Sequence, residues 1–231
     1  MLDVLRQEIK YHITVDCAEK MFFTLSQVMQ GDPFNGNNAY MVRSLYFDSF
    51  YDNDYWEKSA GLNYRKKIRL RVYSPDNQTA KLEMKEKIGS DQRKRSLTVK
   101  REDAQRLIQG DITCLNNYQE PLAEELFYIM KNELYVPRCV VEYKRRAFMA
   151  PVNDIRITFD SEIESNEGDF DIFDKNLCTY PVMSKGELVL EVKYNNFLLS
   201  YIKDMLEQID ATETSNSKYC LARKLGLGSE D

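Results

Sequence analysis

The alternation of charged and aliphatic residues restricts most strongly how this chain can fold. In segment 67–73, with the sequence KIRLRVY, every odd position is cationic or polar and every even position is aliphatic. Successive side chains of a β-strand point to opposite faces, so Lys67, Arg69 and Arg71 share one face. Segments 82–87, 155–160 and 188–193 follow the same period. The sequence therefore predicts a sheet with one apolar face and one charged face.

The elements expected from these patterns give a mainly β, α+β fold in which an antiparallel sheet curls or closes. No Gly-, Ser- or Pro-rich linker divides the chain, which predicts one domain over residues 1–231. Asp16 is expected to cap the first helix, with Glu19 completing a capping box, and Gly110 to end the second. The predicted strands are 4–14, 39–49, 66–73, 79–87, 93–100, 135–149, 155–164 and 187–194. The predicted helices are 16–29, 102–109, 122–131, 198–208 and 218–225, and the predicted loops are 31–38 and 165–180.

The distribution of charge matters more than the net charge of −5. Residues 64–101 carry 13 Lys and Arg against four Asp and Glu, a net charge of +9, and the remainder carries −14. This asymmetry predicts an anionic partner for one region; a solvated face of surface lysines is the alternative. The acidic total argues against a nucleic-acid binder, for which a basic balance is expected.

Histidine and cysteine usage excludes several classes of site. His12 is the only histidine, so a His-rich metal site is excluded. The five cysteines are scattered and form no C-x-x-C pair, which is typical of free thiols in a reducing compartment. No apolar stretch of membrane-spanning length and no signal-peptide pattern is present. These features predict a cytoplasmic protein that does not insert into a membrane.

The charged face also carries a repeated E-x-K pattern. Since helices need an aliphatic face to pack on, the charged face of a closed barrel would point inward. A surface lined with Arg, Lys and Glu suits a polyanion and a divalent cation, because guanidinium groups match phosphate oxygens and carboxylates bind Mg²⁺ or Mn²⁺. Salt-bridge ladders on an outer surface are the alternative. The four pairs are Glu8/Lys10, Glu83/Lys85, Glu142/Lys144 and Glu191/Lys193.

An ordered set of motifs resembles the VTC domain, the polyphosphate polymerase domain of the triphosphate tunnel metalloenzymes. The resemblance covers nearly the whole chain and implies an eight-stranded antiparallel β-barrel tunnel with helices packed outside. Triphosphate-containing substrates are expected inside the tunnel. The motifs are RQEIKY at 6–11, SLYFDS at 44–49, YWEK at 55–58, RKKIRLR at 65–71, LEMK at 82–85, EYKRRAF at 142–148, IRITFD at 155–160, LEVKY at 190–194 and SKY at 217–219.

The resemblance also implies roles for individual residues. Tyr143 resembles a tunnel tyrosine that binds phosphate, and Ser217 with Lys218 resembles a phosphate-binding pair. Glu191 is the expected carboxylate ligand of Mn²⁺ or Mg²⁺, and Glu8 is a second expected ligand. Tyr143 and Arg145 share a strand face, which puts Glu142 and Lys144 on the other. The basic residues expected to bind the phosphates are Lys10, Arg69, Arg71, Lys85, Lys94, Arg145 and Arg156.

The resemblance implies an ATP-dependent polyphosphate polymerase, a phosphotransferase that moves the γ-phosphate of ATP to a growing polyphosphate chain. Hydrolytic relatives begin with E-x-E-x-K, and here Arg6 replaces the first glutamate. Fewer carboxylates give weaker support for a metal that positions water, which favours transfer over hydrolysis. A phosphohydrolase acting on tripolyphosphate or a nucleoside triphosphate, and a non-catalytic polyphosphate-binding module, are the alternatives. The expected partners are ATP and inorganic polyphosphate or triphosphate, with no nucleic acid; a separate membrane partner is left open.

Overall fold

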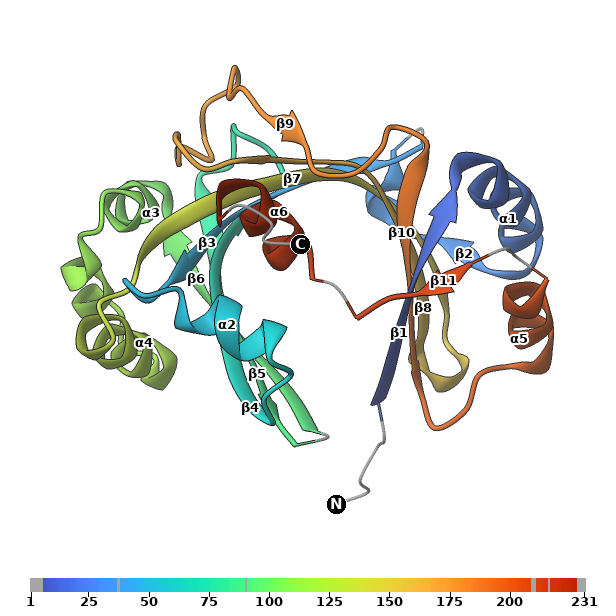
Figure 1. The fold of residues 1–231 in the computed structure, drawn as a ribbon, viewed down its shortest axis with the longest axis horizontal. Helices are drawn as coiled ribbons and strands as arrows, with labels where there is room; N and C mark the ends of the chain where they lie inside the picture. The colour runs from blue at the N-terminus through green and yellow to red at the C-terminus, as the bar shows by residue number, and fades with distance from the viewer. Residues whose placement is uncertain (1–5, 37, 90, 209–210, 216, 228–231) are drawn as a thin grey trace. The chain divides into compact units, whose positions relative to one another are not determined.

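The computed structural model describes residues 6–36, 38–89, 91–208, 211–215 and 217–227 (Figure 1). Strands are more numerous than helices along the chain, with six α-helices between or after them in the described residues. The strands are β1 (Arg6–Thr14), β2 (Gln30–Gly31), β3 (Tyr40–Asp48), β4 (Tyr64–Val72), β5 (Thr79–Ile88), β6 (Asp91–Lys100), β7 (Val136–Ala150), β8 (Ile155–Asn166), β9 (Tyr180–Pro181), β10 (Glu187–Asn195) and β11 (Thr212–Glu213). The α-helices are α1 (Val15–Val28), α2 (Asn53–Ser59), α3 (Arg101–Ile108), α4 (Pro121–Asn132), α5 (Ser200–Glu207) and α6 (Lys218–Leu227). Short 3₁₀ helices span Pro33–Asn35, Ile112–Asn117 and Val152–Asp154.

The eleven strands belong to one hydrogen-bonded sheet, and the order is not that of an eight-stranded closed barrel. The order is β11-β1-β10-β8-β7-β3-β4-β5-β6, with β2 paired to β7 and β9 to β8. Among the described residues this order ends at β11 and at β6, so the sheet is open. The prediction of a closed eight-stranded barrel is therefore wrong. Alternation specifies which face of a strand is polar, whereas closure depends on strand tilt and shear, which the alternation does not encode.

All eight predicted strands are present, and their described ends lie within two residues of the predicted ones; residues 4 and 5 lie outside the described residues. The prediction missed the short strands β2, β9 and β11 and helix α2. The cap of α1 is also different: the Thr14 hydroxyl accepts a hydrogen bond from the Cys17 amide at 3.4 Å. Asp16 and Glu19 lie within the helix, so the predicted capping box is wrong. Thr14 takes this role because it ends β1 in an extended conformation.

The chain divides into two compact units, which are described separately. Unit 1 takes its described residues from 1–41, 143–163 and 183–216, and unit 2 takes them from 42–142, 164–182 and 217–231. The prediction of one domain over residues 1–231 stays a prediction.

In unit 1, β1 pairs with β10 and β10 pairs with β8, all antiparallel. The aliphatic side chains of these strands form one buried core with α1 and α5, which lie together in Figure 1. Leu190 and Val192 of β10 alternate with Glu191 and Lys193, as the sequence predicts. The other face of these strands therefore carries the charged residues.

In unit 2, β3, β4, β5 and β6 pair in sequence order. Ile68, Leu70, Leu82 and Met84 enter a second core, which α3 and α4 cover (Figure 1). Helix α6 lies on the opposite, polar face, where Tyr219 stacks on Tyr46 with ring centroids 5.1 Å apart. The prediction that helices pack on the apolar face therefore holds for α3 and α4 and is wrong for α6.

Across the described part of the chain, none of the helices combines the length and the apolar character that crossing a membrane requires.

Candidate functional sites in the two units

A group of cations lies on the polar face of β4, β5 and β6 in unit 2. We call Lys67, Arg69, Arg71, Lys81, Lys85, Lys87 and Lys94 the unit 2 basic face. The strand register places Lys67 opposite Lys85 and Lys85 opposite Lys94, so three lysines form one row across three strands. The three lysines therefore lie close together on one face, with Lys94 paired to Glu83 at 2.8 Å.

Glu83 is the carboxylate that three of the predicted phosphate-binding residues share. It accepts hydrogen bonds from Arg69 at 2.7 Å and from Lys94 at 2.8 Å, and lies 3.7 Å from Arg71. Burial alone would raise the pKa of Glu83, but the nearby Arg69, Arg71 and Lys94 outweigh it and hold the pKa at about 2. Glu83 is therefore ionised at neutral pH and keeps these side chains in fixed positions.

Two further contacts orient the guanidinium groups of this face. Arg71 donates from Nε to Ser44 Oγ at 3.0 Å, and Arg69 donates to the Tyr46 hydroxyl at 3.1 Å. Ser44 and Tyr46 lie on β3, directly opposite Arg71 and Arg69. Because these partners lie on a paired strand, the Arg side chains are held before any ligand binds, which lowers the entropic cost of binding.

Ser217 and Lys218 lie at the start of helix α6. Ser217 caps the helix, and its Oγ accepts a hydrogen bond from the Cys220 amide at 3.1 Å. Tyr219 donates to Asp48 at 2.5 Å, and the Lys67 ammonium lies 5.9 Å from the Tyr219 ring centroid. Tyr219 therefore fixes the start of α6 beside the unit 2 basic face.

Asp48 joins α6 to α2. Its carboxylate accepts from the amides of Asp54 at 2.9 Å and Tyr55 at 3.0 Å. These are two of the amide groups at the start of α2, which have no partner within the helix.

We expect Tyr219→Phe to lower the stability of the protein by about 1.5–3 kcal/mol, the contribution of a hydrogen bond to a charged group. The change removes the hydrogen bond to the buried Asp48 but keeps the ring that stacks on Tyr46, so α6 loses an anchor without losing its packing. A thermal melt measures the loss. Tyr128→Phe, at an exposed position on α4, is the matched control; an equal fall in melting temperature there would contradict the anchoring role of Tyr219.

The polar face of unit 1 carries an alternating network of acids and bases. Glu8 lies opposite Lys193, and Lys10 lies opposite Glu191, across the β1–β10 pair. Lys10 Nζ lies 2.9 Å from Glu8, and Lys193 Nζ lies 2.6 Å from Glu191 and 3.7 Å from Glu8. Two of the E-x-K pairs are therefore parts of one network.

Arg145 is held by a buried carboxylate that the site prediction does not include. Its guanidinium makes two hydrogen bonds to Asp160, at 2.6 and 2.8 Å, and lies 4.0 Å from Glu191. The guanidinium also lies 5.2 Å from the ring centroid of Tyr143. Tyr143 and Arg145 therefore lie together, as predicted, whereas Lys144 makes an exposed ion pair with Glu162 at 2.7 Å.

Arg156 pairs with Asp32 at 2.8 Å and with the Tyr40 hydroxyl at 3.1 Å. The neighbouring Thr158 lies opposite Glu191, and its hydroxyl is buried without a hydrogen-bond partner. A buried hydroxyl without a partner is uncommon in proteins and suits a site where a ligand supplies the partner.

The metal prediction rests on two carboxylates in unit 1. Glu8 and Glu191 are hard oxygen donors of the kind that Mg²⁺ and Mn²⁺ bind, and Lys193 contacts both. In the described part of the chain, no group of three or more His, Cys, Asp or Glu side chains is arranged to hold a metal ion. One or two carboxylates completed by substrate phosphates are sufficient for Mg²⁺. The residues therefore fit a metal that binds together with phosphate.

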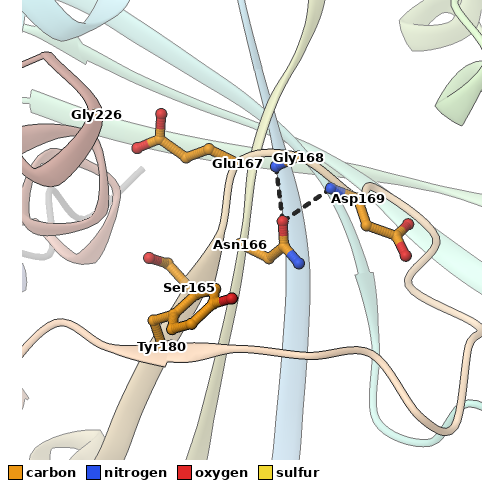
Figure 2. A pocket seen from close by; sticks show the side chains of 7 residues that line it. All are labelled: Ser165, Asn166, Glu167, Gly168, Asp169, Tyr180 and Gly226. Atoms are coloured by element: carbon orange, nitrogen blue, oxygen red, sulfur yellow. Dashed lines mark hydrogen bonds between the residues drawn. The ribbon is translucent and has the colours of Figure 1, made fainter.

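The acidic segment 165–180 lies at a pocket in unit 2 with a volume of about 550 Å³ (Figure 2). Glu167 and Asp169 line it, together with Ser165, Asn166, Gly168, Tyr180 and Gly226. The Asn166 side chain accepts from the amides of Gly168 and Asp169, which fixes the turn (Figure 2). Because its charged side chains are carboxylates, this pocket does not suit a phosphate chain, and none of the predicted site residues lines it.

Asp160, Asp32 and Lys193 were not among the predicted site residues. Asp160 ends the alternating segment 155–160, and the alternation puts it on the same polar face as Arg156. The sequence pattern could therefore have identified it as a site residue. Lys193 belongs to a recognised E-x-K pair, but pairing between β1 and β10 is what brings it to Glu8. Asp32 gave no comparable signal, because it lies in a predicted loop.

Comparison with solved structures supports the fold. A Bacillus halodurans protein described as a candidate adenylate cyclase aligns with a TM-score of 0.51 and 10% identity, covering 97% of this chain and 100% of that one. The Schizosaccharomyces pombe Mediator head module contains a chain that aligns with a TM-score of 0.50 and 8% identity, covering 90% of this chain and 99% of that one. No curated protein matches the sequence.

The VTC domain family matches residues 5–226, a range that includes every predicted site residue. It covers the strands that carry the unit 2 basic face and the acid–base network of unit 1. This chain therefore belongs to the VTC domain family.

Proposed function

We propose that this chain is a polyphosphate polymerase-type phosphotransferase that moves the γ-phosphoryl group of ATP onto a growing polyphosphate chain. The observation that carries the proposal is the row of Lys67, Lys85 and Lys94 beside Arg69 and Arg71 in a VTC domain. These cations are neighbours across three paired strands. Such a run of positive charge matches the closely spaced negative charges of a phosphate chain.

Charge balance separates the roles of the two units. In unit 2, Glu83 is shared by Arg69, Arg71 and Lys94, so the face keeps a positive excess. In unit 1, Lys10, Lys193, Arg145 and Arg156 pair with Glu8, Glu191, Asp160 and Asp32, so cations and carboxylates are equal in number within this network. The proposal therefore assigns most of the phosphate neutralisation to unit 2.

Phosphoryl transfer suits a site of this composition. Its transition state spreads negative charge over the phosphoryl oxygens, so catalysis depends mainly on positioning and charge stabilisation. Guanidinium groups bind these oxygens through two parallel hydrogen bonds. Arg69 and Arg71 are already oriented by Ser44, Tyr46 and Glu83. The proposed reaction therefore needs neither a protein nucleophile nor a histidine base.

The proposal includes a divalent cation, Mn²⁺ or Mg²⁺, held by Glu191 with Glu8 as a second carboxylate. When bound, the ion supplies additional neutralisation of phosphate oxygens. Arg145 stays paired with Asp160. It also lies 4.0 Å from Glu191 and helps to orient the Glu191 carboxylate.

We expect Glu191→Gln to weaken the binding of Mn²⁺ and to slow the reaction. The amide keeps the shape of the side chain but loses the charge, so the ion loses its main protein ligand. Activity at saturating ATP is expected to fall by about 10²-fold, with the half-saturating Mn²⁺ concentration raised. A titration with Mn²⁺ at fixed ATP measures both. Glu187→Gln, at the exposed start of the same strand, is the control; an unchanged titration in Glu191→Gln would remove Glu191 from the metal site.

Product analysis after incubation with ATP and Mn²⁺ tests the proposed function. Long-chain polyphosphate, resolved by gel electrophoresis and by ³¹P NMR, is the expected product. Free phosphate without polymer would identify a phosphohydrolase and overturn the proposal. Binding of polyphosphate with neither product would identify a binding module and would also overturn it.

A further inference from the structure

Lys193 lies between the two carboxylates that are proposed to hold the metal. Its ammonium nitrogen is 2.6 Å from Glu191 Oε1 and 3.7 Å from Glu8 Oε2. The second oxygen of Glu8, Oε1, lies 2.9 Å from Lys10. The second oxygen of Glu191, Oε2, lies 4.0 Å from Arg145. Each of the four carboxylate oxygens therefore already faces a cation of the chain itself.

The strand pairing makes this arrangement rigid. Glu8 is opposite Lys193 and Lys10 is opposite Glu191. Each acid therefore has a lysine across the strand pair and another lysine two residues away on its own strand. All four belong to unit 1, and their side chains are largely shielded from water. Partial burial strengthens each ion pair relative to one on the surface, because less water screens the charges.

From this geometry we propose that Lys193 is a built-in competitor for the metal at Glu8 and Glu191. The ammonium group neutralises the carboxylates in the free protein, so a divalent ion must displace Lys193 before it can bind both. This inference rests on the proposed function for the identity of the ion. Lys193 would therefore weaken metal binding to the free protein, and a bound phosphate group would offer its ammonium a new partner.

The alternative is that Lys193 holds the carboxylates in place for the metal, and the two roles predict opposite results. If Lys193 competes, removing its charge tightens metal binding. If Lys193 positions the carboxylates, removing it weakens metal binding, because Glu8 and Glu191 then repel each other without a shared cation.

The test is direct binding of Mn²⁺ to the whole protein without nucleotide. Binding is measured as the loss of the electron paramagnetic resonance signal of free Mn²⁺. The variants are Lys193→Met, which removes the charge at similar length, and Lys193→Gln, which keeps a hydrogen-bond donor. Both are expected to bind Mn²⁺ at least about tenfold more tightly than the native chain. The double variant Lys193→Met/Glu191→Gln is expected to lose the gain, since it lacks the main carboxylate.

Lys144→Met is the matched control, because Lys144 also pairs with a glutamate in unit 1 but is exposed. It is expected to leave Mn²⁺ affinity unchanged. Unchanged or weaker binding in both Lys193 variants would overturn the inference, and so would a gain that persists in the double variant. Melting curves and circular dichroism of each variant show whether it is folded, and the two substitutions keep the test decisive if one fails to fold.

The ATP product assay separates this inference from the proposed function. Polymer formed by the native chain, with Mn²⁺ affinity unchanged in the Lys193 variants, would overturn only the role of Lys193. Tighter Mn²⁺ binding in the variants, with no polymer from the native chain, would support the competitor role and overturn only the proposed function.

Discussion

Arg71→Ala is expected to lower kcat for polyphosphate synthesis by about 10²- to 10³-fold, the range found when one preorganised donor to a developing charge is removed. Arg71 is buried on β4, where Ser44 and Glu83 orient its guanidinium. The remaining partners of Glu83, Arg69 and Lys94, still neutralise that carboxylate in the variant. The fold is therefore expected to survive while phosphoryl transfer is lost.

The measurement is the rate of polymer formation at saturating ATP, with a melting curve to show that the variant is folded. Arg93→Ala is the control, because Arg93 is exposed on β6 and faces away from the basic face, next to Lys94. Full activity in Arg71→Ala would remove Arg71 from the site. Equal losses in both variants would indicate a general charge effect.

Asp160→Asn is expected to destabilise the protein by about 3–5 kcal/mol, because it leaves the largely buried Arg145 without its charged partner. Asp160 is fully buried and makes two hydrogen bonds to the guanidinium. For a chain of this size, that loss corresponds to a fall in melting temperature of roughly 10 °C. Glu191, 4.0 Å from Arg145, is too distant to replace Asp160 fully.

Thermal denaturation followed by circular dichroism measures this effect. Glu162→Gln lies two residues further along β8 and breaks the exposed pair with Lys144. Exposed pairs contribute about 0–1 kcal/mol, so this control is expected to change the melting temperature little. A fall of less than about 3 °C in Asp160→Asn would contradict the view that Asp160 anchors Arg145.

The position of the strands and their polar faces could be predicted from the sequence, because the period-two pattern is local. Lys67, Arg69 and Arg71 share a face as predicted, and so do Tyr143 and Arg145. The register between strands is not local. The row of Lys67, Lys85 and Lys94 follows from two hairpins whose turn geometry sets the pairing, and the sequence pattern alone does not specify it.

The side chains that pair with the predicted phosphate-binding residues could not be predicted in the same way. Asp32 reaches Arg156 over a separation of 124 residues in the chain, and no local pattern signals such a contact. Helix α6 was predicted correctly as a helix, but its place on the polar face depends on Tyr219 stacking on Tyr46 and bonding to Asp48. These contacts depend on tertiary packing, which overrides the expectation that helices cover only apolar faces.

The pairing of β1 with β10 has a consequence for how the chain folds. Ile9 pairs with Val192, so this part of unit 1 cannot form until residue 192 has been synthesised. The β4–β5–β6 meander, in contrast, joins neighbours in sequence and can form early. During synthesis the lysine row is therefore assembled before the Glu8–Glu191 network exists. A nascent chain paused before residue 187 should already bind polyanions, without the carboxylates that β10 later contributes.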